Sequence, residues 1–340
     1  MNHTENYLIV SLGSIGRRHL KNLRQLKPDA QIAVWRQHTT DLSFQPPEGA
    51  DFQFTTSEEV LAFKPKVAII AGPSSSHIST AMLLAKAGTH LLIEKPIANS
   101  LSGVDELIAI CNKSNLVLMV GYNLRFFPSL NETKRMVDED VIGHVLYVQA
   151  EVGQYLPDWR PALDYRKGVT AQDSLGGGVL LELSHELDYI YWMFGMPDSV
   201  SAFGGHLSEL ELDVEDTVEL LLEYHSPKCL INVHLDMIQR APVRRCRIVG
   251  EKGTIIWDAI ADHIDFYTVQ EKNWQNLSHF ALMDRNQMYI DELNHFFDCI
   301  NGASKPLVSG ENARDVIAIV EAAKLSIQNN SRTEMKQYAK

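Results

Sequence analysis

The feature that most constrains the fold is the regular alternation of strand-like and helix-like segments in the first third of the chain. Apolar runs typical of buried strands alternate with stretches whose apolar residues have helical spacing. The expected strands are Tyr7–Leu12, Gln31–Trp35, Val67–Ala71, His90–Ile93 and Val117–Val120, and the expected helices are Ile15–Leu26, Ser76–Ala87 and Leu101–Asn112, the last with Ser100 as its N-cap. This alternation predicts right-handed βαβ units and a parallel sheet with helices on both faces.

A different pattern begins near Gly121. A helix-like segment near Leu130–Val137 precedes the strand-like "HVLYVQAEV", and later strands are separated by short turns such as "HSPK" and "GEKG". The later strands are Ser199–Phe203, Thr217–Tyr224, Cys229–Leu235, Arg245–Val249, Gly253–Trp257 and Ile264–Val269, and the last helices are Gln287–Ile300 and Glu311–Gln328. Short turns favour hairpins, so this part is predicted to be an α+β domain with a largely antiparallel, open sheet.

The chain is therefore predicted to be an α/β protein of two domains. Its 340 residues exceed the size at which a single core usually stops growing. The boundaries implied by the change of pattern are 1–121 for the first domain and 122–340 for the second. The C-terminal helix is free to pack back on the first domain.

Composition excludes several classes of protein. A formal charge of -12 argues against nucleic acid as the main partner, and no apolar run is long enough to cross a bilayer. The start, "MNHTENY", lacks the basic and apolar regions of a signal peptide. The cysteines are scattered without a C-x-x-C pair, at Cys111, Cys229, Cys246 and Cys299. We expect a cytoplasmic protein without a metal site that acts on a small molecule.

The first strand-to-helix junction, "LIVSLGSIGRRHL", has the spacing of a dinucleotide-binding loop with one glycine replaced. The usual pattern is G-x-G-x-x-G, and the three positions are here Ser11, Gly13 and Gly16. Gly13 permits a pyrophosphate to approach the backbone at a helix N-terminus, and Gly16 permits the helix to pack on the strand. Ser11 is tolerable if its backbone angles are ordinary. Gly13, Ser14, Ile15 and Gly16 are the expected cofactor-binding loop.

The end of the second strand bears on the choice of dinucleotide. A carboxylate about 20 residues after the loop would hold the ribose 2′-hydroxyl of NAD. The segment "IAVWRQH" has Trp35, Arg36 and Gln37 there instead. Arg36 can pair with a 2′-phosphate or stack on adenine, which favours NADP. NAD stays open, since an arginine at this position can also face solvent.

Two polar clusters carry the expected chemistry. "LLIEKPIANS" places Glu94 and Lys95 just past a parallel strand, where open α/β sheets bind ligands, although an ordinary charged junction is the alternative. "GGGVLLELSHELDYIYWMFG" indicates a glycine loop and a helix with Glu182, His185 and Asp188 on neighbouring turns of one face. Histidine is a suitable general base for an alcohol proton near neutral pH.

These segments together resemble the glucose–fructose oxidoreductase, inositol dehydrogenase and MocA family (Gfo/Idh/MocA). The resemblance runs along nearly the whole chain, through "GSIGRRHLKNL", "AGPSSSHISTAMLLAKAGTHLLIEKP", "GYNLRFFP", the glycine-led helix, "VGEKGTIIWD" and "KPLVSGENARDVIAIVEAA". It implies a Rossmann domain and a second domain whose open sheet mediates oligomers, here a homodimer or homotetramer. It also implies NAD(P)-dependent oxidation or reduction of a hydroxyl or carbonyl, usually on a sugar or cyclitol.

The resemblance implies roles for single residues. Lys95 and His185 match the catalytic lysine and histidine, and the other matches are Pro73, Ser74 and His77 beside the cofactor, Glu94 near the nicotinamide ribose and Asn123 near the nicotinamide. One position departs, because Leu181 stands where many members have an aspartate and Glu182 follows it. Either Glu182 takes over as the third catalytic group or the chain belongs to a subgroup with the S-H-E-L-D variant.

The loop "YLPDWRPALDYRKG" suggests the substrate class. Aromatic faces suit sugar rings and arginines suit carboxylates or phosphates, which favours an anionic or nucleotide-linked sugar. The expected substrate-binding residues are Trp159, Arg160, Asp164, Tyr165 and Arg166 of this loop, with Tyr122 and Asp188. The alternative is a loop that packs between protomers.

The expected reaction is hydride transfer between a sugar carbon and the nicotinamide. In this interpretation His185 exchanges the hydroxyl proton, while Lys95 orients that oxygen and stabilises its developing charge. Two rival functions stay open. One is a related nicotinamide enzyme with another substrate or reaction, such as a biliverdin-like or cyclic imine reductase or glycoside cleavage through transient oxidation. The other is a dinucleotide-binding sensor without turnover.

Overall fold

The computed structural model describes residues 5–37, 45–278, 280 and 284–338, and the chain divides into two compact units. Unit 1 is Met1–Asn123 with Asn286–Arg314, and unit 2 is Leu124–Arg285 with Asp315–Lys340. The expected division at residue 121 leaves 286–314 in the second domain, whereas this segment groups with unit 1. The helix α10 (Gly310–Asn329) begins in unit 1 and ends in unit 2.

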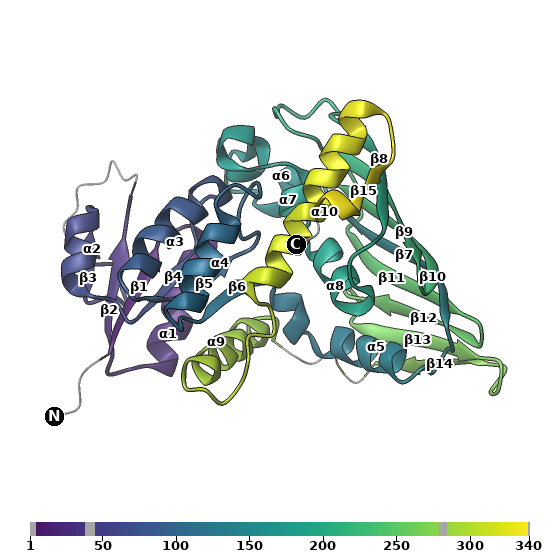
Figure 1. Cartoon of the computed structure of the whole chain (residues 1–340), viewed down its shortest axis with the longest axis horizontal. Helices are drawn as coiled ribbons and strands as arrows, with labels where there is room; N and C mark the ends of the chain where they lie inside the picture. Colours follow the sequence, from purple (N-terminus) through teal and green to yellow (C-terminus); the bar gives the residue numbers. More distant parts are fainter. Residues whose placement is uncertain (1–4, 38–44, 279, 281–283, 339–340) are drawn as a thin grey trace. The chain divides into compact units, whose positions relative to one another are not determined.

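The sheet of unit 1 has six strands, and each neighbouring pair is parallel (Figure 1). Its order is β3 (Phe52–Phe54), β2 (Gln31–Trp35), β1 (Asn6–Val10), β4 (Val67–Ile70), β5 (His90–Glu94) and β6 (Leu118–Gly121). The predicted parallel sheet is confirmed. Strand β3 was not expected, because three half-exposed residues are too short to show a strand period.

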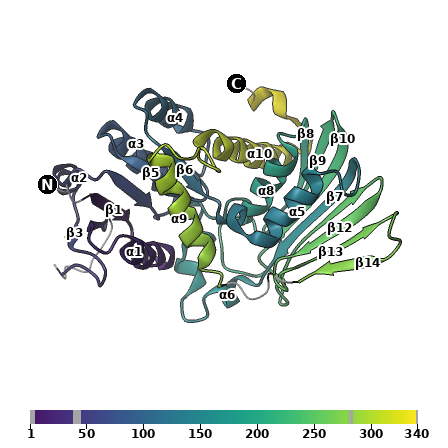
Figure 2. The same cartoon turned by 90° about the horizontal axis from the view of Figure 1, so that it is seen from below.

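Helices cover both faces of this sheet. They are α1 (Ser14–Leu26), α2 (Ser57–Phe63), α3 (His77–Lys86), α4 (Val104–Lys113) and α9 (Gln287–Ile300). Figure 2 shows α1 on the opposite side of the strands from α3 and α4. Helix α4 begins later than its expected start after Ser100, because Gly103 at its N-cap has a φ of +77° that only a glycine adopts without strain.

The carboxyl ends of the parallel strands gather the loops that matter for binding. Strand β1 lies between β2 and β4, so the order of the strands reverses beside it. At that edge Val10 pairs with Ile70, and Glu94 pairs with Gly121. The loops after β1, β4, β5 and β6 therefore lie along one edge, which is where open α/β sheets bind their ligands.

The sheet of unit 2 has nine strands. Its order is β14 (Trp274–Leu277), β13 (His263–Thr268), β12 (Gly253–Asp258), β11 (Val243–Gly250), β7 (Val145–Gly153), β10 (Lys228–Asp236), β9 (Thr217–His225), β8 (Ser199–Gly205) and β15 (Thr333–Glu334). Strands β7 and β10 pair in parallel, and the other neighbours are antiparallel, which confirms the prediction of a largely antiparallel sheet.

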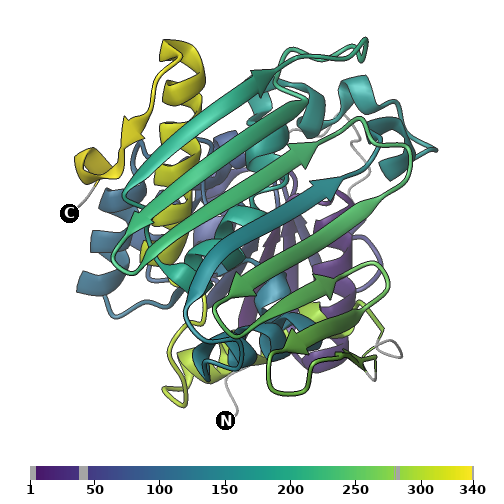
Figure 3. The same ribbon diagram turned by 90° about the vertical axis from the view of Figure 1, so that its right-hand side faces the viewer.

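The two faces of this sheet differ in what covers them. Helices α5 (Pro128–Asp138), α7 (Val179–Glu182) and α8 (His185–Phe194) contact one face, toward which the buried residues of β9 and β10 point. In Figure 3 the other face is seen directly, and none of the described helices crosses it. Large apolar side chains are exposed on its strands, among them Leu146, Leu221 and Leu230.

Two expectations from composition have a structural counterpart. In the part of the chain that the structure describes, every helix is too short or too polar to span a membrane. All four cysteines are buried and form no disulfide.

Candidate functional site

The glycine loop leaves the N-terminus of α1 open to an anion. Gly13 is the N-cap and has no side chain to cap the helix, and the first turn has no acidic residue. A Cβ on Gly13 would meet no atom within 4 Å, so nothing in the described chain fills the space beside it. Unpaired amides and the helix dipole favour a negative charge here. The donors present therefore fit the pyrophosphate of a dinucleotide.

Gly16 has a packing role, as its place in the pattern predicts. A Cβ at this position would lie 2.2 Å from the backbone oxygen of Ser11. Any other residue would push α1 away from β1 and from the loop between them. The second glycine of the pattern thus serves the ligand, and the third serves the contact between helix and strand.

Ser11 does not meet the condition under which serine is a tolerable replacement for the first glycine. Its φ is +71°, in the left-handed region that favours glycine, and not an ordinary backbone angle. Its amide donates to the carbonyl of Trp35 at 2.9 Å, which holds the turn in this conformation. The missing glycine is therefore a real conformational cost and not a neutral replacement.

We expect Ser11→Gly to raise the free energy of unfolding by about 1 kcal/mol, because it removes the steric cost of a side chain at positive φ. Chemical denaturation of the two proteins measures this difference. The matched control is Ser79→Gly, at an exposed position inside α3, where glycine should lower the same quantity by about 0.5–1 kcal/mol. Equal losses in both variants would show that Ser11 is not strained.

The end of β2 has no carboxylate among its described residues, which are Trp35, Arg36 and Gln37. The amide of Arg36 donates to the carbonyl of Phe54 at 2.9 Å, and the Gln37 side chain donates to Thr80 at 3.1 Å. These bonds hold the backbone at the position where a ribose hydroxyl is usually bound. The Arg36 side chain is half-buried.

A buried histidine joins the loops after β4 and β5. His77 is 1% exposed, and its two ring nitrogens lie 2.9 Å from the carbonyl oxygens of Gly72 and Pro96. Burial lowers its pKa, although both backbone hydrogen bonds oppose this. His77 thus fastens the loop of Pro73 and the buried Ser74 to the segment that follows Lys95, rather than contacting a ligand with its ring.

The acid–lysine pair after β5 has two different environments. Glu94 is 8% exposed, and its Oε1 lies 2.6 Å from His19 Nε2 on α1. A Cβ on Gly121 would lie 3.3 Å from the Glu94 carboxyl, so glycine keeps the end of β6 clear for this side chain. Lys95 is half-buried at the same edge. The pair thus offers an anchored acceptor beside an ammonium group.

The segment after β6 is more buried than expected. Tyr122 is 0% exposed within unit 1, so its side chain presents no surface to a substrate. Asn123 is 6% exposed and shares a hydrogen bond with Tyr289 of α9. We therefore assign Tyr122 to the core, and Asn123 remains the member of this segment that is tied to polar neighbours.

The glycine-led motif of unit 2 forms two short helices instead of the single helix expected. Helix α7 ends at Glu182, and α8 begins at His185. Gly178, with a φ of +99°, leads into α7, where the Leu180 amide donates to Glu215 at 3.1 Å. The break turns Glu182 and His185 outward, since both are half-exposed while Ser184 between them is buried.

Glu182 and Asp188 separate into different roles. Thr170 donates to the Glu182 carboxylate at 3.2 Å, which anchors this half-exposed acid. Asp188 is 0% exposed and accepts two hydrogen bonds from Arg125, at 2.7 and 3.0 Å. Since its oxygens are engaged by a buried guanidinium, the expectation that Asp188 binds substrate is replaced by a structural role.

The predicted substrate loop surrounds a cavity of about 280 Å³ in unit 2. Its lining consists of Leu156, Trp159, Arg160, Leu163, Asp164, Tyr165, Lys167, Gly168 and Thr170. The lining includes four of the five residues predicted from this loop. The fifth, Arg166, does not line the cavity, because its guanidinium binds Asp164 at 2.8 Å and Glu211 at 3.0 Å. Lys167 and Thr170 are lining residues that the sequence interpretation missed.

Three residues around Glu94 were also missed, namely His19, Tyr289 and Glu292. They come from α1 and from α9, a helix that begins about 270 residues after the glycine loop. A signal for one of them was present, because Glu292 falls among the buried apolar positions of α9 rather than on its polar side. An acid in an apolar stripe indicates a group with a specific partner.

Two family models match the chain. Residues 5–122 match the NAD-binding Rossmann fold of the GFO_IDH_MocA oxidoreductase family, and residues 134–335 match the C-terminal alpha/beta domain of the same family. The chain is 24% identical to a myo-inositol 2-dehydrogenase of Thermotoga maritima, over 97% of this chain and 98% of that protein. It is 22% identical to the scyllo-inositol 2-dehydrogenase (NAD(+)) of Bacillus subtilis, over 98% and 97%.

Solved structures show the same fold. A levoglucosan dehydrogenase in complex with NADH has a TM-score of 0.84 at 19% identity, covering 98% of this chain and 99% of that one. The WlbA dehydrogenase of Bordetella pertussis, in complex with NADH and UDP-GlcNAcA, has a TM-score of 0.80 at 20% identity, with the same coverage. At these identities the likeness concerns the arrangement of elements and not the substrate.

Proposed function

Since the chain belongs to the Gfo/Idh/MocA family of oxidoreductases, we propose that it oxidises or reduces a sugar, sugar derivative or cyclitol with a nicotinamide dinucleotide. The observation that carries the proposal is the edge of unit 1, where an open helix N-terminus follows β1 and Glu94 with Lys95 follows β5. The relatives named inositol dehydrogenases support the substrate class.

In this proposal Lys95 and His185 have different roles in the reaction at one carbon of the substrate. The dinucleotide, when bound, supplies the nicotinamide that takes or returns the hydride. His185 takes the proton of the reacting hydroxyl, and the Lys95 ammonium hydrogen-bonds that oxygen and stabilises its developing negative charge. Glu182, held by Thr170, is the third group and orients the substrate or the histidine.

Residues of the glycine loop hold the dinucleotide itself. Gly13, Ser14 and Ile15 offer backbone amides to the pyrophosphate at the start of α1. Pro73, Ser74, Glu94 and Asn123 line the edge that follows the loop, and His77 keeps that edge together through its bonds to Gly72 and Pro96. The ring of His77 is thus a positioning group in this proposal.

The cavity of unit 2 favours a ring substrate with an anionic group. Trp159 is fixed by a hydrogen bond from its Nε1 to the carbonyl of Gln154 at 2.9 Å, so its ring is held in place for stacking. Arg160 and Lys167 add positive charge to the same lining. We propose that this loop binds a sugar that bears a carboxylate or a phosphate.

A coupled absorbance assay tests the proposed function. Purified protein is incubated with NAD or NADP and a panel of cyclitols, neutral sugars, uronic acids and nucleotide-linked sugars, and formation of the reduced nicotinamide is followed. We expect turnover with at least one member of the panel. Tight dinucleotide binding without turnover on any substrate would favour a sensor, and absence of dinucleotide binding would overturn the proposal.

The dinucleotide preferred in this proposal is NADP, on account of Arg36 and of the missing carboxylate at the end of β2. We expect Arg36→Asp to shift the ratio of kcat/KM for NADP over NAD about 10–100-fold toward NAD, because it removes a charge-assisted bond to the 2′-phosphate and introduces repulsion. Arg36→Gln, which only removes the charge, should give a smaller shift. An unchanged ratio in both variants would place Arg36 in solvent.

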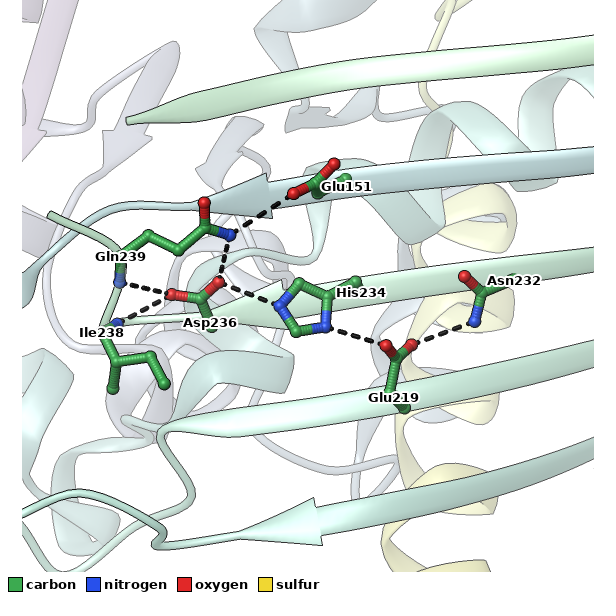
Figure 4. Close-up of polar contacts among 7 residues, drawn as sticks. All are labelled: Glu151, Glu219, Asn232, His234, Asp236, Ile238 and Gln239. Atoms are coloured by element: carbon green, nitrogen blue, oxygen red, sulfur yellow. Dashed lines mark hydrogen bonds and ion pairs between the residues drawn. The ribbon is translucent and has the colours of Figure 1, made fainter. Parts of the chain in front are cut away.

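We also propose a homodimer or homotetramer formed through the open face of the unit 2 sheet. Besides its exposed apolar residues, this face carries an ordered polar network (Figure 4). The Asp236 carboxylate accepts from the amides of Ile238 and Gln239 at 2.8 Å, and His234 joins it to Glu219. Such a rigid mixed surface suits a second copy of itself. Light scattering measures the number of subunits in the assembly.

We also propose a cytoplasmic location, which the buried free cysteines support.

A further inference from the structure

A fully buried acid lies beside Glu94 in unit 1. Glu292, on α9, is 0% exposed, and neither of its carboxyl oxygens has a hydrogen-bond partner among the described residues. One oxygen each of Glu292 and Glu94 and one ring nitrogen of His19 lie within 4.8 Å of one another. His19 is also 0% exposed, and its Nδ1 has no partner in the described chain. Three ionisable groups thus share one buried site next to the proposed dinucleotide edge.

The distances indicate how protons are divided within this cluster. At 2.6 Å, His19 Nε2 and Glu94 Oε1 form a short hydrogen bond of the charge-assisted kind, in which Glu94 is the ionised acceptor. Two carboxylates as close as Glu94 and Glu292 disfavour double ionisation, because burial weakens the screening between them. Burial and the nearby Glu94 raise the pKa of Glu292 well above that of an ordinary carboxyl. Glu292 is therefore the member that keeps a proton.

A shared cation is a poorer explanation of the same three groups. In such a site the histidine nitrogen and the carboxylate oxygen point their lone pairs at the ion, and the other ring nitrogen donates to a second partner. Here Nε2 and Oε1 lie at hydrogen-bond distance from each other, and Nδ1 has no acceptor among the residues that the structure describes. The geometry is that of a proton between the two groups.

The surroundings link the cluster to the edge of the sheet. The charged and titratable groups around Glu292 are Glu94 from β5, His19 from α1 and Tyr289 from its own helix, with Arg18 beyond them. Tyr289 packs edge-on against His19 at 6.0 Å, and the Arg18 guanidinium lies 4.6 Å from the centre of the tyrosine ring. Tyr289 also bonds Asn123, so α9 contacts the loop after β6 as well.

We propose that Glu292 is a positioning residue that stays protonated and, together with His19, holds the Glu94 carboxylate as an ionised acceptor at the dinucleotide edge. The last step of this inference rests on the proposed function, because in it Glu94 accepts a hydrogen bond from a hydroxyl of the bound dinucleotide. When Glu292 loses its proton at alkaline pH, a second negative charge appears within 4.8 Å of the first. The stability of the free protein and its affinity for the dinucleotide then both decrease.

The sign of the pH effect follows from the direction of the shift. Because the pKa of Glu292 is raised in the folded state, its contribution to stability is fully present below the ordinary carboxyl pKa of about 4.3. This contribution is lost as the pH rises through the raised pKa of the folded state. Glu292→Gln, which has the shape of the neutral acid, should remove this dependence.

The test compares the wild-type protein with Glu292→Gln, without dinucleotide, by chemical unfolding at a series of pH values. We expect the two proteins to be equally stable near pH 4. Above that pH, the unfolding equilibrium constant of the wild type should rise about tenfold per pH unit relative to that of the variant, until the pH passes the pKa of Glu292. The dissociation constant of NADH, measured by fluorescence, should increase at alkaline pH in the wild type and stay constant in the variant. Glu106→Gln, at an exposed position of α4, is the control and should follow the wild type.

Infrared spectroscopy gives a readout that does not require the variant to be stable. The wild type should show the carbonyl band of a buried protonated carboxyl at neutral pH, and the band should disappear as the pH is raised. The proposal would be overturned if the stability of both proteins changed with pH in parallel and the wild type showed no such band. It would also be overturned if the wild type bound one equivalent of metal tightly and Glu292→Gln did not. A level NADH affinity in the wild type would overturn the positioning role. If the protein binds no dinucleotide at all, the proposed function fails, but the infrared band still shows whether Glu292 is protonated.

Discussion

Replacing Lys95 or His185 with alanine is expected to lower turnover about 10²–10³-fold, while dinucleotide affinity changes little. Lys95→Ala removes the ammonium that stabilises the charge on the reacting oxygen. His185→Ala removes the base that takes its proton. Both residues are half-buried, Lys95 at the edge of unit 1 and His185 at the start of α8.

Steady-state kinetics with the best substrate of the panel and NADH titrations by fluorescence measure these two quantities separately. Matched controls are Lys113→Ala, at the exposed end of α4, and His225→Ala, on the exposed end of β9. Both controls should retain wild-type turnover. Wild-type turnover in Lys95→Ala or in His185→Ala would refute the role assigned to that residue. A large loss of dinucleotide affinity with little change in kcat would move the residue from chemistry to cofactor binding.

The largest expected loss of stability belongs to Asp188→Ala, which should reduce the free energy of unfolding by about 3–5 kcal/mol. Arg125 is 2% exposed, and it donates two hydrogen bonds to the Asp188 carboxylate, which compensates its charge. Its guanidinium also lies 5.4 Å from the centre of the Trp192 ring, so it cannot turn toward water without losing that contact. Removing the carboxylate therefore takes its counter-charge away from a buried guanidinium.

An exposed ion pair on the neighbouring helix provides the comparison. Asp138 binds Lys134 at 2.7 Å on α5, with about half of the Asp138 side chain exposed. Asp138→Ala should cost no more than about 1 kcal/mol, because the hydrogen bonds between these two side chains are exposed to solvent. Urea unfolding of both variants measures the contrast. Similar losses of stability in the two variants would mean that burial does not control the strength of these ion pairs. A third variant, Asp188→Asn, tests whether a neutral hydrogen-bond acceptor is enough to stabilise the buried Arg125.

Elements whose residues repeat with a clear period could be predicted from the sequence. The five strands expected in the first domain lie in the parallel sheet within one or two residues of their predicted ends. The same holds for the strands of the second domain, because each alternates between a buried and an open face, as in β9 and β10. Strands β3, β14 and β15 were missed, since segments of two to four residues are too short to show a period.

The details of the candidate site were less predictable. Ser11 adopts a positive φ because its turn is held by a hydrogen bond to Trp35, a residue of the next strand. The helix around His185 breaks after Glu182, although its apolar spacing continues through the break. Asp188 carries the same kind of carboxylate as Glu182, but the distant Arg125 occupies it. For Ser11 and for Asp188, a partner far along the chain decided the outcome.

The sequence by itself determined the two-part α/β architecture, the dinucleotide loop and the candidate pair of Lys95 and His185, because periodicity and short motifs are properties of neighbouring residues. Only the tertiary structure brought α9 to unit 1 and placed Glu292 beside Glu94 and His19. The physical reason is that burial and electrostatic coupling depend on distance in space. Residues separated by almost 200 positions along the chain, such as Glu94 and Glu292, carry no mark in the sequence that they share a site.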